Sequence, residues 1–305
     1  MELKNKIFCT TNPARISDAL WDVMSASNVA PADMLIFLPS RRTVRSAEEM
    51  ILNKTGGDAV ILPRMVALGE GADEFDDADD DVRGADVISN TERVAVIAKL
   101  LAADANIGGL AAALPVAHDL VRMTDYLENE GINAADLDWA NLVDEKYAAH
   151  FQGKAQILNI ISRVMPQYIA PRTTVAARRN ADIRAWIKYI AENQDAWKLI
   201  IVCASTASVP ATRDLMTAVA RDARGRIILP GMIADKNLRE SDMALATNPY
   251  NSEYKFLTGL GLRHTDITVL DTGPSAIGFM NAAFGNAPDA APDAGVSSIS
   301  VRLQK

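Results

Sequence analysis

The sequence is poor in the residues that build metal sites and disulfides. It holds two cysteines and three histidines in 305 residues. Two thiols cannot supply the four ligands of a structural zinc or iron–sulfur site, and His118, His150 and His264 show no ligand spacing. Cys9 and Cys203 each stand inside an apolar run, which predicts buried thiols that pack as small hydrophobic side chains. We therefore expect no metal ion and no cofactor.

Positive charge and long apolar runs are also scarce. The net charge of −8 argues against a protein that coats nucleic acid through bulk charge, although it leaves room for a local basic groove. No apolar run approaches the ~20 residues of a membrane span. Residues 1–6 lack the apolar core of a signal peptide. These absences predict a cytoplasmic protein with no membrane partner.

The first 65 residues alternate between apolar runs and helical periodicity. Asn12 and Pro13 form a helix-start signal, and the run Met34 to Leu38 is closed by Pro39. Buried strands of a parallel sheet read as such continuous apolar runs. We expect strands at 6–9, 34–38 and 59–62, and helices at 13–26 and 41–52. This order indicates the start of an α/β sheet with helices on both faces.

An acidic segment follows the third expected strand. Residues 70–86 hold nine carboxylates and little apolar content. Asp77, Asp79 and Asp81 alternate as calcium ligands would, but the central glycine and closing glutamate of a calcium loop are missing. The segment therefore favours a solvated, mobile loop.

A long helical block then interrupts the α/β pattern. Ser89 and Glu92 have the spacing of a capping box, and apolar residues recur at helical spacing as far as residue 195. Strands are expected again at 199–203, 227–229 and 267–270, with helices at 210–221 and 253–260. The sequence thus predicts an α/β core in two parts, 1–88 and 196–284, around an all-helical insertion at 89–195, with a linker or disordered tail at 285–305.

The turn after the first strand is where an α/β protein of the P-loop type would bind a nucleotide. A phosphate-binding loop needs glycines whose amides approach the phosphates, followed by a lysine and a hydroxyl for magnesium. Thr10, Thr11 and Asn12 stand there instead, with no glycine and no lysine, and no Rossmann fingerprint is present. The bare helix start could attract an anion, but an ordinary strand–helix turn is the simpler interpretation.

The turn after strand 199–203 is where such a nucleotidase would carry its acidic, magnesium-binding pair. Ser205, Thr206 and Ser208 occupy this turn, and no carboxylate follows before Asp214. The hydroxyl cluster could form an anion-binding turn, or Ser208 could simply cap the next helix. Both turns are therefore degenerate nucleotide-site positions. We expect no catalytic residue, no ATP hydrolysis and no tight binding of magnesium–nucleotide.

A basic cluster stands where the second strand meets its helix. Arg41, Arg42 and Arg45 fall within five residues. Three arginines so close together could contact the phosphates of nucleic acid, or they could form a solvated helix start. Arg178 and Arg179 form a second, weaker pair.

Several segments together resemble one family. They are Leu38-Pro39-Ser40-Arg41-Arg42, Leu62-Pro63-Arg64, residues 204–215, Ile228-Leu229-Pro230-Gly231, and Asn248-Pro249-Tyr250 with Phe256-Leu257 and Leu260-Gly261-Leu262. Their order and spacing over about residues 6–270 are similar to the N-terminal, helicase-like region of AddB, in its alphaproteobacterial form. AddB is the second subunit of the AddAB helicase–nuclease. The block at 204–215 is the most specific of these segments.

The resemblance implies a superfamily-one helicase-like fold whose motor has decayed. In that family, AddB pairs with the helicase–nuclease subunit AddA in double-strand break repair, and its decayed helicase part helps to recognise the regulatory Chi sequence. In helicases of this type, the position of Arg41, Arg42 and Arg45 faces single-stranded DNA. A typical AddB is far longer and carries a nuclease domain with an iron–sulfur cluster. Because the present sequence has neither a nuclease motif nor a cysteine cluster, a truncated AddB-like module without nuclease activity is expected.

Two other functions fit the sequence. One is a small α/β enzyme that binds a nucleotide or phosphate ligand at the Ser205, Thr206 and Ser208 turn, although no base is paired with a serine nucleophile. The other is a defunct structural remnant without a ligand. Nucleotide binding distinguishes the first of these, and binding to an AddA-like subunit distinguishes the module from the remnant.

Overall fold

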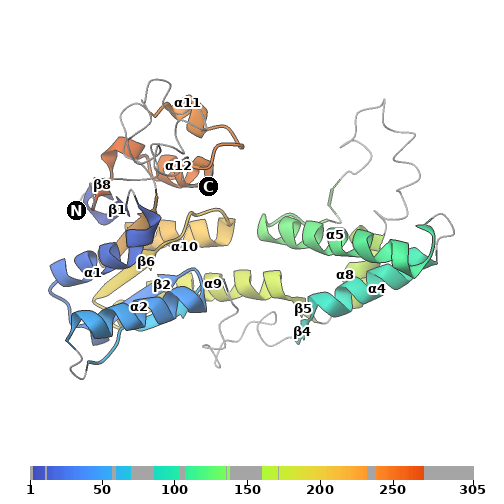
Figure 1. Ribbon diagram of the computed structural model, residues 1–305, viewed down its shortest axis with the longest axis horizontal. Helices are drawn as coiled ribbons and strands as arrows, with labels where there is room; N and C mark the ends of the chain where they lie inside the picture. Colours follow the sequence, from blue (N-terminus) through green and yellow to red (C-terminus); the bar gives the residue numbers. More distant parts are fainter. Residues whose placement is uncertain are drawn as a thin grey trace, which may run out of the picture. The chain divides into compact units, whose positions relative to one another are not determined.

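The chain divides into two compact units, which are described separately (Figure 1). The sheet unit comprises Met1–Glu70, Trp186–Ser208 and Thr212–Lys305, and the helical unit comprises Gly71–Ala185 with Val209–Ala211. The computed structural model describes residues 3–10, 12–56, 60–69, 86–103, 107–134, 136–137, 160–170, 172–231 and 238–270. Most of the acidic segment (70–85) and the whole expected tail (285–305) lie outside the described residues.

The sheet unit is built on six parallel strands within the described ranges. They are β1 (Ile7–Thr10), β2 (Met34–Leu38), β3 (Arg64–Ala67), β6 (Leu199–Cys203), β7 (Gly225–Pro230) and β8 (Thr268–Val269). Their spatial order is β3-β2-β6-β7-β1-β8, and every pairing is parallel. The prediction that the early and late strands share one parallel sheet is therefore confirmed, since β6 and β7 lie between β2 and β1.

The expected third strand at 59–62 is wrong. Residues 60–63 have no regular structure, and β3 begins at Arg64, directly after Pro63. Proline has no N–H to donate to a strand ladder, so pairing with β2 starts only beyond it. The register joins Leu35 to Arg64 and Leu38 to Ala67. Ile61, in the apolar run that suggested a strand, is 74% exposed.

The helices of the sheet unit begin and end close to the expected positions, except for the short helix at 240–243, which the sequence did not predict. They are α1 (Ile16–Ala26), α2 (Arg41–Lys54), α10 (Pro210–Arg221), α11 (Glu240–Met243) and α12 (Asn251–Gly259). Short 3-10 turns stand at η1 (Leu3–Lys6), η2 (Pro13–Arg15), η3 (Pro31–Asp33) and η7 (His264–Asp266). Asn12 caps η2 as predicted, because its side-chain oxygen accepts from the Ala14 amide at 3.0 Å.

The core of the sheet unit follows from the alternation of side chains along the strands. Leu20 and Met24 of α1 and Ile51 of α2 belong to the cluster that contains Ile36 and Ile201. On the opposite face, Phe37 meets Trp186 of α9 (Val175–Glu192), whose ring centroid is 5.2 Å away. Buried apolar side chains therefore lie on both faces, which is why β2 and β6 are buried along their whole length.

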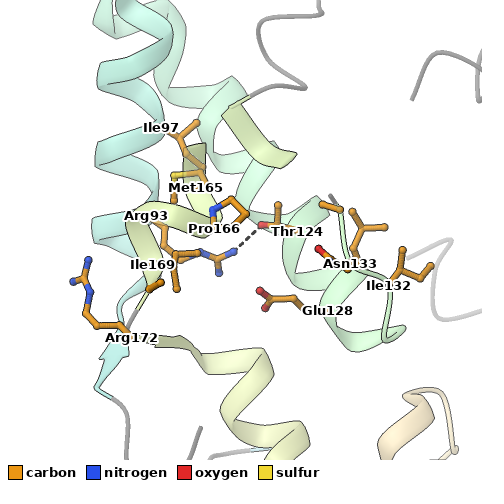
Figure 2. A pocket seen from close by; sticks show the side chains of 13 residues that line it. Arg93, Ile97, Thr124, Glu128, Ile132, Asn133, Met165, Pro166, Ile169 and Arg172 are labelled. Carbon is orange, nitrogen blue, oxygen red and sulfur yellow. Dashed lines mark hydrogen bonds between the residues drawn. The ribbon is translucent and has the colours of Figure 1, made fainter. Parts of the chain in front are cut away.

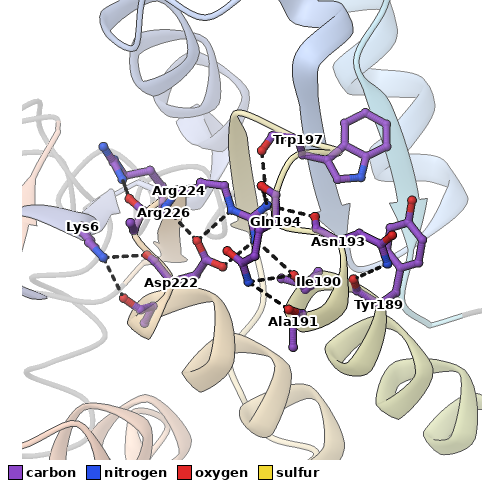
Figure 3. A network of polar contacts seen from close by, with 12 residues as sticks. Lys6, Tyr189, Ile190, Ala191, Asn193, Gln194, Trp197, Asp222, Arg224 and Arg226 are labelled. Atoms are coloured by element: carbon purple, nitrogen blue, oxygen red, sulfur yellow. Dashed lines mark hydrogen bonds and ion pairs between the residues drawn. The ribbon is translucent and has the colours of Figure 1, made fainter.

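A polar network closes the amino end of the sheet (Figure 3). Arg224 donates to the backbone oxygens of Gln194 at 2.5 Å and Ile190 at 3.1 Å, and pairs with the Asp222 carboxylate at 2.7 Å. Lys6 donates to the backbone oxygen of Asp222 at 2.6 Å. Cations at these positions satisfy carbonyl groups at the C-termini of α9 and α10. The network thus ties together segments that are distant in the sequence.

The helical unit contains α4 (Asn90–Ala102), α5 (Leu110–Asn129), a π-helical turn η6 (Ile160–Val164), α8 (Met165–Ile169) and the first part of α9. Ile97 and Leu101 of α4 pack against Ala117 and Val121 of α5, as the helical periodicity predicts. Ser89 caps α4 by accepting from the Glu92 amide at 3.1 Å.

The helical unit is not all-helical, and this part of the prediction is wrong. Two strands of two residues each, β4 (Val87–Ile88) and β5 (Thr173–Thr174), pair in parallel. Each contains only β-branched residues, which favour extended backbone, but a run of two is too short to show a period. In the part of the chain that the structure describes, no helix is both long and apolar enough to cross a lipid bilayer.

Candidate functional site

The carboxyl ends of the parallel strands meet at one edge of the sheet unit. β1 ends at Thr10, β2 at Leu38, β6 at Cys203 and β7 at Pro230. Because ligands of open α/β sheets bind beyond this edge, the turns that leave it form the candidate site. β7 separates β1 from β6, so the ends of β1 and β6 are roughly 10 Å apart, or two strand spacings.

The turn after β1 uses its polar groups internally. Thr10 is fully buried, and its hydroxyl donates to the Asn12 carbonyl at 2.5 Å and accepts from the Asn12 amide at 3.1 Å. The Asn12 side chain in turn holds the Ala14 amide. Thr11 lies outside the described residues. Thr10 and Asn12 therefore stabilise a tight turn and leave little for a phosphate group.

The same turn is closely packed by the end of β7. Gly231 has a φ of +65°, and a Cβ built on it would come within 3.0 Å of the Pro13 ring. Glycine is needed there both for its left-handed backbone and for the close approach. The space above β1, where a nucleotide phosphate would sit, is thus bounded by Pro13 and Gly231.

The turn after β6 has a strained backbone. Ala204 and Ala207 adopt left-handed conformations with φ of +65° and +56°, which are unfavourable for residues with a Cβ. The turn is held by the Ser205 hydroxyl, which accepts from the Ala207 amide at 3.3 Å, and by Arg213, whose Nε donates to the Ala207 carbonyl at 3.2 Å. Thr206 is exposed.

The β6 turn contributes no acidic group. Ser208 is exposed, like Thr206, and the first carboxylate after the strand is Asp214, an exposed residue inside α10. Within the described ranges, no three histidine, cysteine or acidic side chains gather as a metal site would require. Cys203 is buried, and burial raises the pKa of its thiol to about 12, so it remains a protonated thiol with little nucleophilic character. The prediction that Cys9 and Cys203 are buried thiols is confirmed.

The structure brings Arg41, Arg42 and Arg45 together at the start of α2. With Ser46 and Glu49 they line a surface hollow of about 360 Å³. All three arginines are exposed. In the part of the chain that the structure describes, neither Arg42 nor Arg45 forms an ion pair with a carboxylate.

The helix start that carries these arginines is well defined. Ser40 accepts from the Thr43 amide at 3.3 Å, and the Thr43 hydroxyl accepts from the Ser40 amide at 3.0 Å, which completes a reciprocal cap. Ala47 and Ile51 bury the opposite face of α2. The arginines therefore project from a fixed helix turn that leaves the sheet directly after β2.

A brace that the sequence did not reveal holds the same turn. The amides of Leu68 and Gly69 donate to the carbonyls of Leu38 at 2.8 Å and Pro39 at 2.9 Å. A Cβ on Gly69 would lie 2.5 Å from the Pro39 oxygen, so only glycine permits this approach. The sequence does show a glycine, Gly69, directly after an apolar run. Its role becomes clear only when the third strand is placed at Arg64–Ala67 instead of 59–62.

No protein-family model matches the chain, and no curated protein matches it significantly.

Proposed function

We propose that this chain is a non-catalytic, helicase-like module of the AddB type. In this role it binds an AddA-like helicase–nuclease subunit and, through Arg41, Arg42 and Arg45, single-stranded DNA during double-strand break repair. The resemblance over residues 6–270 suggests the family, and the arginine cluster suggests the ligand.

The observation that carries the DNA-binding proposal is the position of the cluster. Arg41 and Arg45, and likewise Arg42 and Arg45, are spaced so that they share one helix face, and all three line one hollow beyond the carboxyl end of β2. Cations at a helix N-terminus are disfavoured by the helix dipole, by about 0.3–1 kcal/mol each. An anionic ligand such as a phosphate backbone offsets this cost, since the dipole favours negative charge at the same place.

The chemistry of the neighbouring turns supports a module without a motor. Thr10 and Asn12 bond to their own turn, and the β6 turn offers hydroxyl groups but no carboxylate. Phosphoryl transfer depends on a phosphate-cradling loop, a lysine and a metal-holding acid. A chain without these groups can still bind a polynucleotide by its phosphates, because that needs only positioned cations.

The test is the binding of a fluorescent oligo-dT strand, followed by anisotropy over a salt series. Three phosphate contacts on single-stranded DNA predict a log–log salt slope of roughly −2. We expect the variant with Arg41, Arg42 and Arg45 all changed to Ala to bind weakly, with a slope near zero. Its fold should be retained, since surface substitutions usually cost within about 0.5 kcal/mol.

The matched control changes Arg122, Arg184 and Arg221 to Ala. These arginines are also exposed on helices, so the control loses the same charge from other places. Affinity and slope should stay close to those of the unchanged chain. Equal slopes for the unchanged chain and the α2 variant, or an equal loss in the control, would show that the cluster is only a solvated face.

The partner is tested separately by mixing the chain with a purified AddA-type subunit and measuring the mass of the complex. A one-to-one complex that persists in the α2 arginine variant is the expected result. Failure to form a complex would contradict the AddB assignment without affecting the DNA-binding result.

A further inference from the structure

The helical unit contains a pocket of about 240 Å³ that no part of the proposed function uses. Figure 2 shows it between α4, α5 and α8. Most of its wall is apolar, formed by Ile97, Leu127, Ile132, Met165 and Ile169. A mostly apolar pocket with a few converging polar groups is the usual form of a small-molecule site.

Two cations at the pocket are already neutralised. Arg93 is almost fully buried, forms an ion pair with Asp125 and donates to the Thr124 hydroxyl at 2.7 Å. Arg172 pairs with Glu92 at 2.8 Å. Neither cation therefore brings unbalanced positive charge into the pocket.

Glu128 differs from these groups. Its carboxylate accepts from the Thr174 hydroxyl, which is neutral, and no ion pair joins it to a cation among the described residues. Burial raises the pKa of Glu128, and the Thr174 hydrogen bond and the charge of Arg93 only partly oppose this effect. The Glu128 carboxylate therefore lies at the pocket with a neutral hydrogen-bond donor, Thr174, and with no ion-pair partner among the described residues.

We propose that this pocket binds a small organic ammonium ion with an apolar body. The ammonium group donates to the Glu128 carboxylate, and the body packs on Leu127, Ile132 and Ile169. An anion would meet the unbalanced charge of Glu128, and a neutral molecule would leave it unpaired. Since a water molecule occupies about 30 Å³ of liquid, the pocket has room for roughly eight groups of that size, which suits a single ring with a short amine arm.

The test uses three probes of similar size on the full chain at pH 7: benzylamine, benzyl alcohol and phenylacetate, which carry a cationic, a neutral and an anionic head. Binding is followed by NMR titration. For a ligand of about eight heavy atoms we expect a dissociation constant on the order of 1 mM for benzylamine. Benzyl alcohol should bind about tenfold more weakly, because it lacks a charge-assisted hydrogen bond, and phenylacetate should not saturate.

Two variants locate the binding. Glu128→Gln keeps an acceptor for Thr174 but removes the charge, so the preference for benzylamine over benzyl alcohol should fall below about twofold. Ala134→Trp adds bulk to a residue that lines the pocket and should abolish binding of both probes. Ala112→Trp, on an exposed part of α5 outside the pocket, is the matched control and should leave both affinities unchanged.

Two measurements test the proposal: the order of the three probe affinities, and the change of benzylamine affinity with pH. Benzylamine affinity should fall as the pH is lowered through the pKa of Glu128, while benzyl alcohol affinity stays constant. Equal affinity for benzylamine and benzyl alcohol, tighter binding of phenylacetate, or a benzylamine preference that persists in Glu128→Gln would each overturn the proposal. If Glu128→Gln fails to fold, the ranking on the unchanged chain and the two tryptophan variants decide it.

Discussion

Replacing Glu253 with glutamine should stabilise the protein at alkaline pH. Glu253 lies in α12 with only 3% of its surface exposed. Its Oε2 atom is buried and, among the described residues, accepts no hydrogen bond. Burial raises the pKa of this carboxyl from 4.5 to about 7, and a hydrogen bond from the backbone lowers it only in part. The folded state therefore favours the neutral acid, unlike a surface glutamate.

The size of the effect follows from the difference between the folded and unfolded pKa values. Each unit corresponds to about 1.4 kcal/mol, so the rise from 4.5 to about 7 amounts to about 3 kcal/mol. Because the pKa of this acid is raised in the folded state, the free energy of unfolding decreases as the pH rises. Below pH 4.5 both states hold the proton, between 4.5 and 7 only the folded state does, and stability falls until it levels off above pH 7.

The assay is urea unfolding from pH 4 to pH 9, with the difference between Glu253→Gln and the unchanged chain plotted against pH. We expect a difference near zero at pH 4 and a gain of up to about 3 kcal/mol for the variant at pH 8. Glu192→Gln, at an exposed glutamate of α9, is the control and should give a flat difference. A flat difference for Glu253→Gln as well would refute the reasoning, because it would mean that the carboxyl finds a partner or water in solution.

Three further predictions concern the turns and the polar network of the sheet unit. Ala204→Gly should raise the free energy of unfolding by about 1 kcal/mol, since glycine adopts the left-handed backbone of this position without strain, whereas Ala218→Gly inside α10 should lower it by about 1 kcal/mol; chemical denaturation compares the two. Arg224→Met should cost about 3 kcal/mol at neutral pH, because it leaves the mostly buried Asp222 carboxylate without its ion-pair partner. Arg224 holds the pKa of Asp222 below its usual range, so this loss, measured by urea unfolding, should shrink as the pH falls toward that pKa. Calorimetry with Mg–ATP should detect no binding in the micromolar range, and micromolar affinity would contradict the degenerate interpretation of the Thr10 and Ser205 turns.

The parts of the fold that were predictable are those in which local pattern and tertiary packing agree. Continuous apolar runs such as 34–38 and 199–203 became the central strands β2 and β6, because a strand covered on both faces has no polar side to show. The third strand was misplaced because Val60 to Leu62 is a continuous aliphatic run, whereas β3 begins with the charged Arg64. The missing N–H of Pro63 marks the boundary, and its effect depends on pairing with β2.

The candidate site was predictable where its residues lie close together in the sequence. Arg41, Arg42 and Arg45 share a helix face by spacing alone, so their common hollow follows from the helical period. The brace from Gly69 to Pro39 was not predictable, because it joins two turns across a strand pair whose register had to be known. The left-handed backbone at Ala204 and Ala207 was equally hidden, since alanine gives no sign of positive φ.

The largest gap in the prediction concerns two acids, the buried Glu253 and the partly buried Glu128. Glu128 and Glu253 stand in helices among other polar residues, where a glutamate normally faces water. Nothing in their spacing separates them from exposed residues such as Glu192. Only the packed structure shows that Glu128 faces an apolar pocket and that the Oε2 atom of Glu253 finds no hydrogen-bond donor among the described residues. A carboxylate that is shielded from water and has no cation beside it costs free energy, so each either serves a ligand or reduces stability. The probe titrations test whether Glu128 serves a ligand, because a ligand site would prefer the ammonium probe. The pH series tests whether Glu253 reduces stability, because that cost changes only with the protonation of the carboxyl.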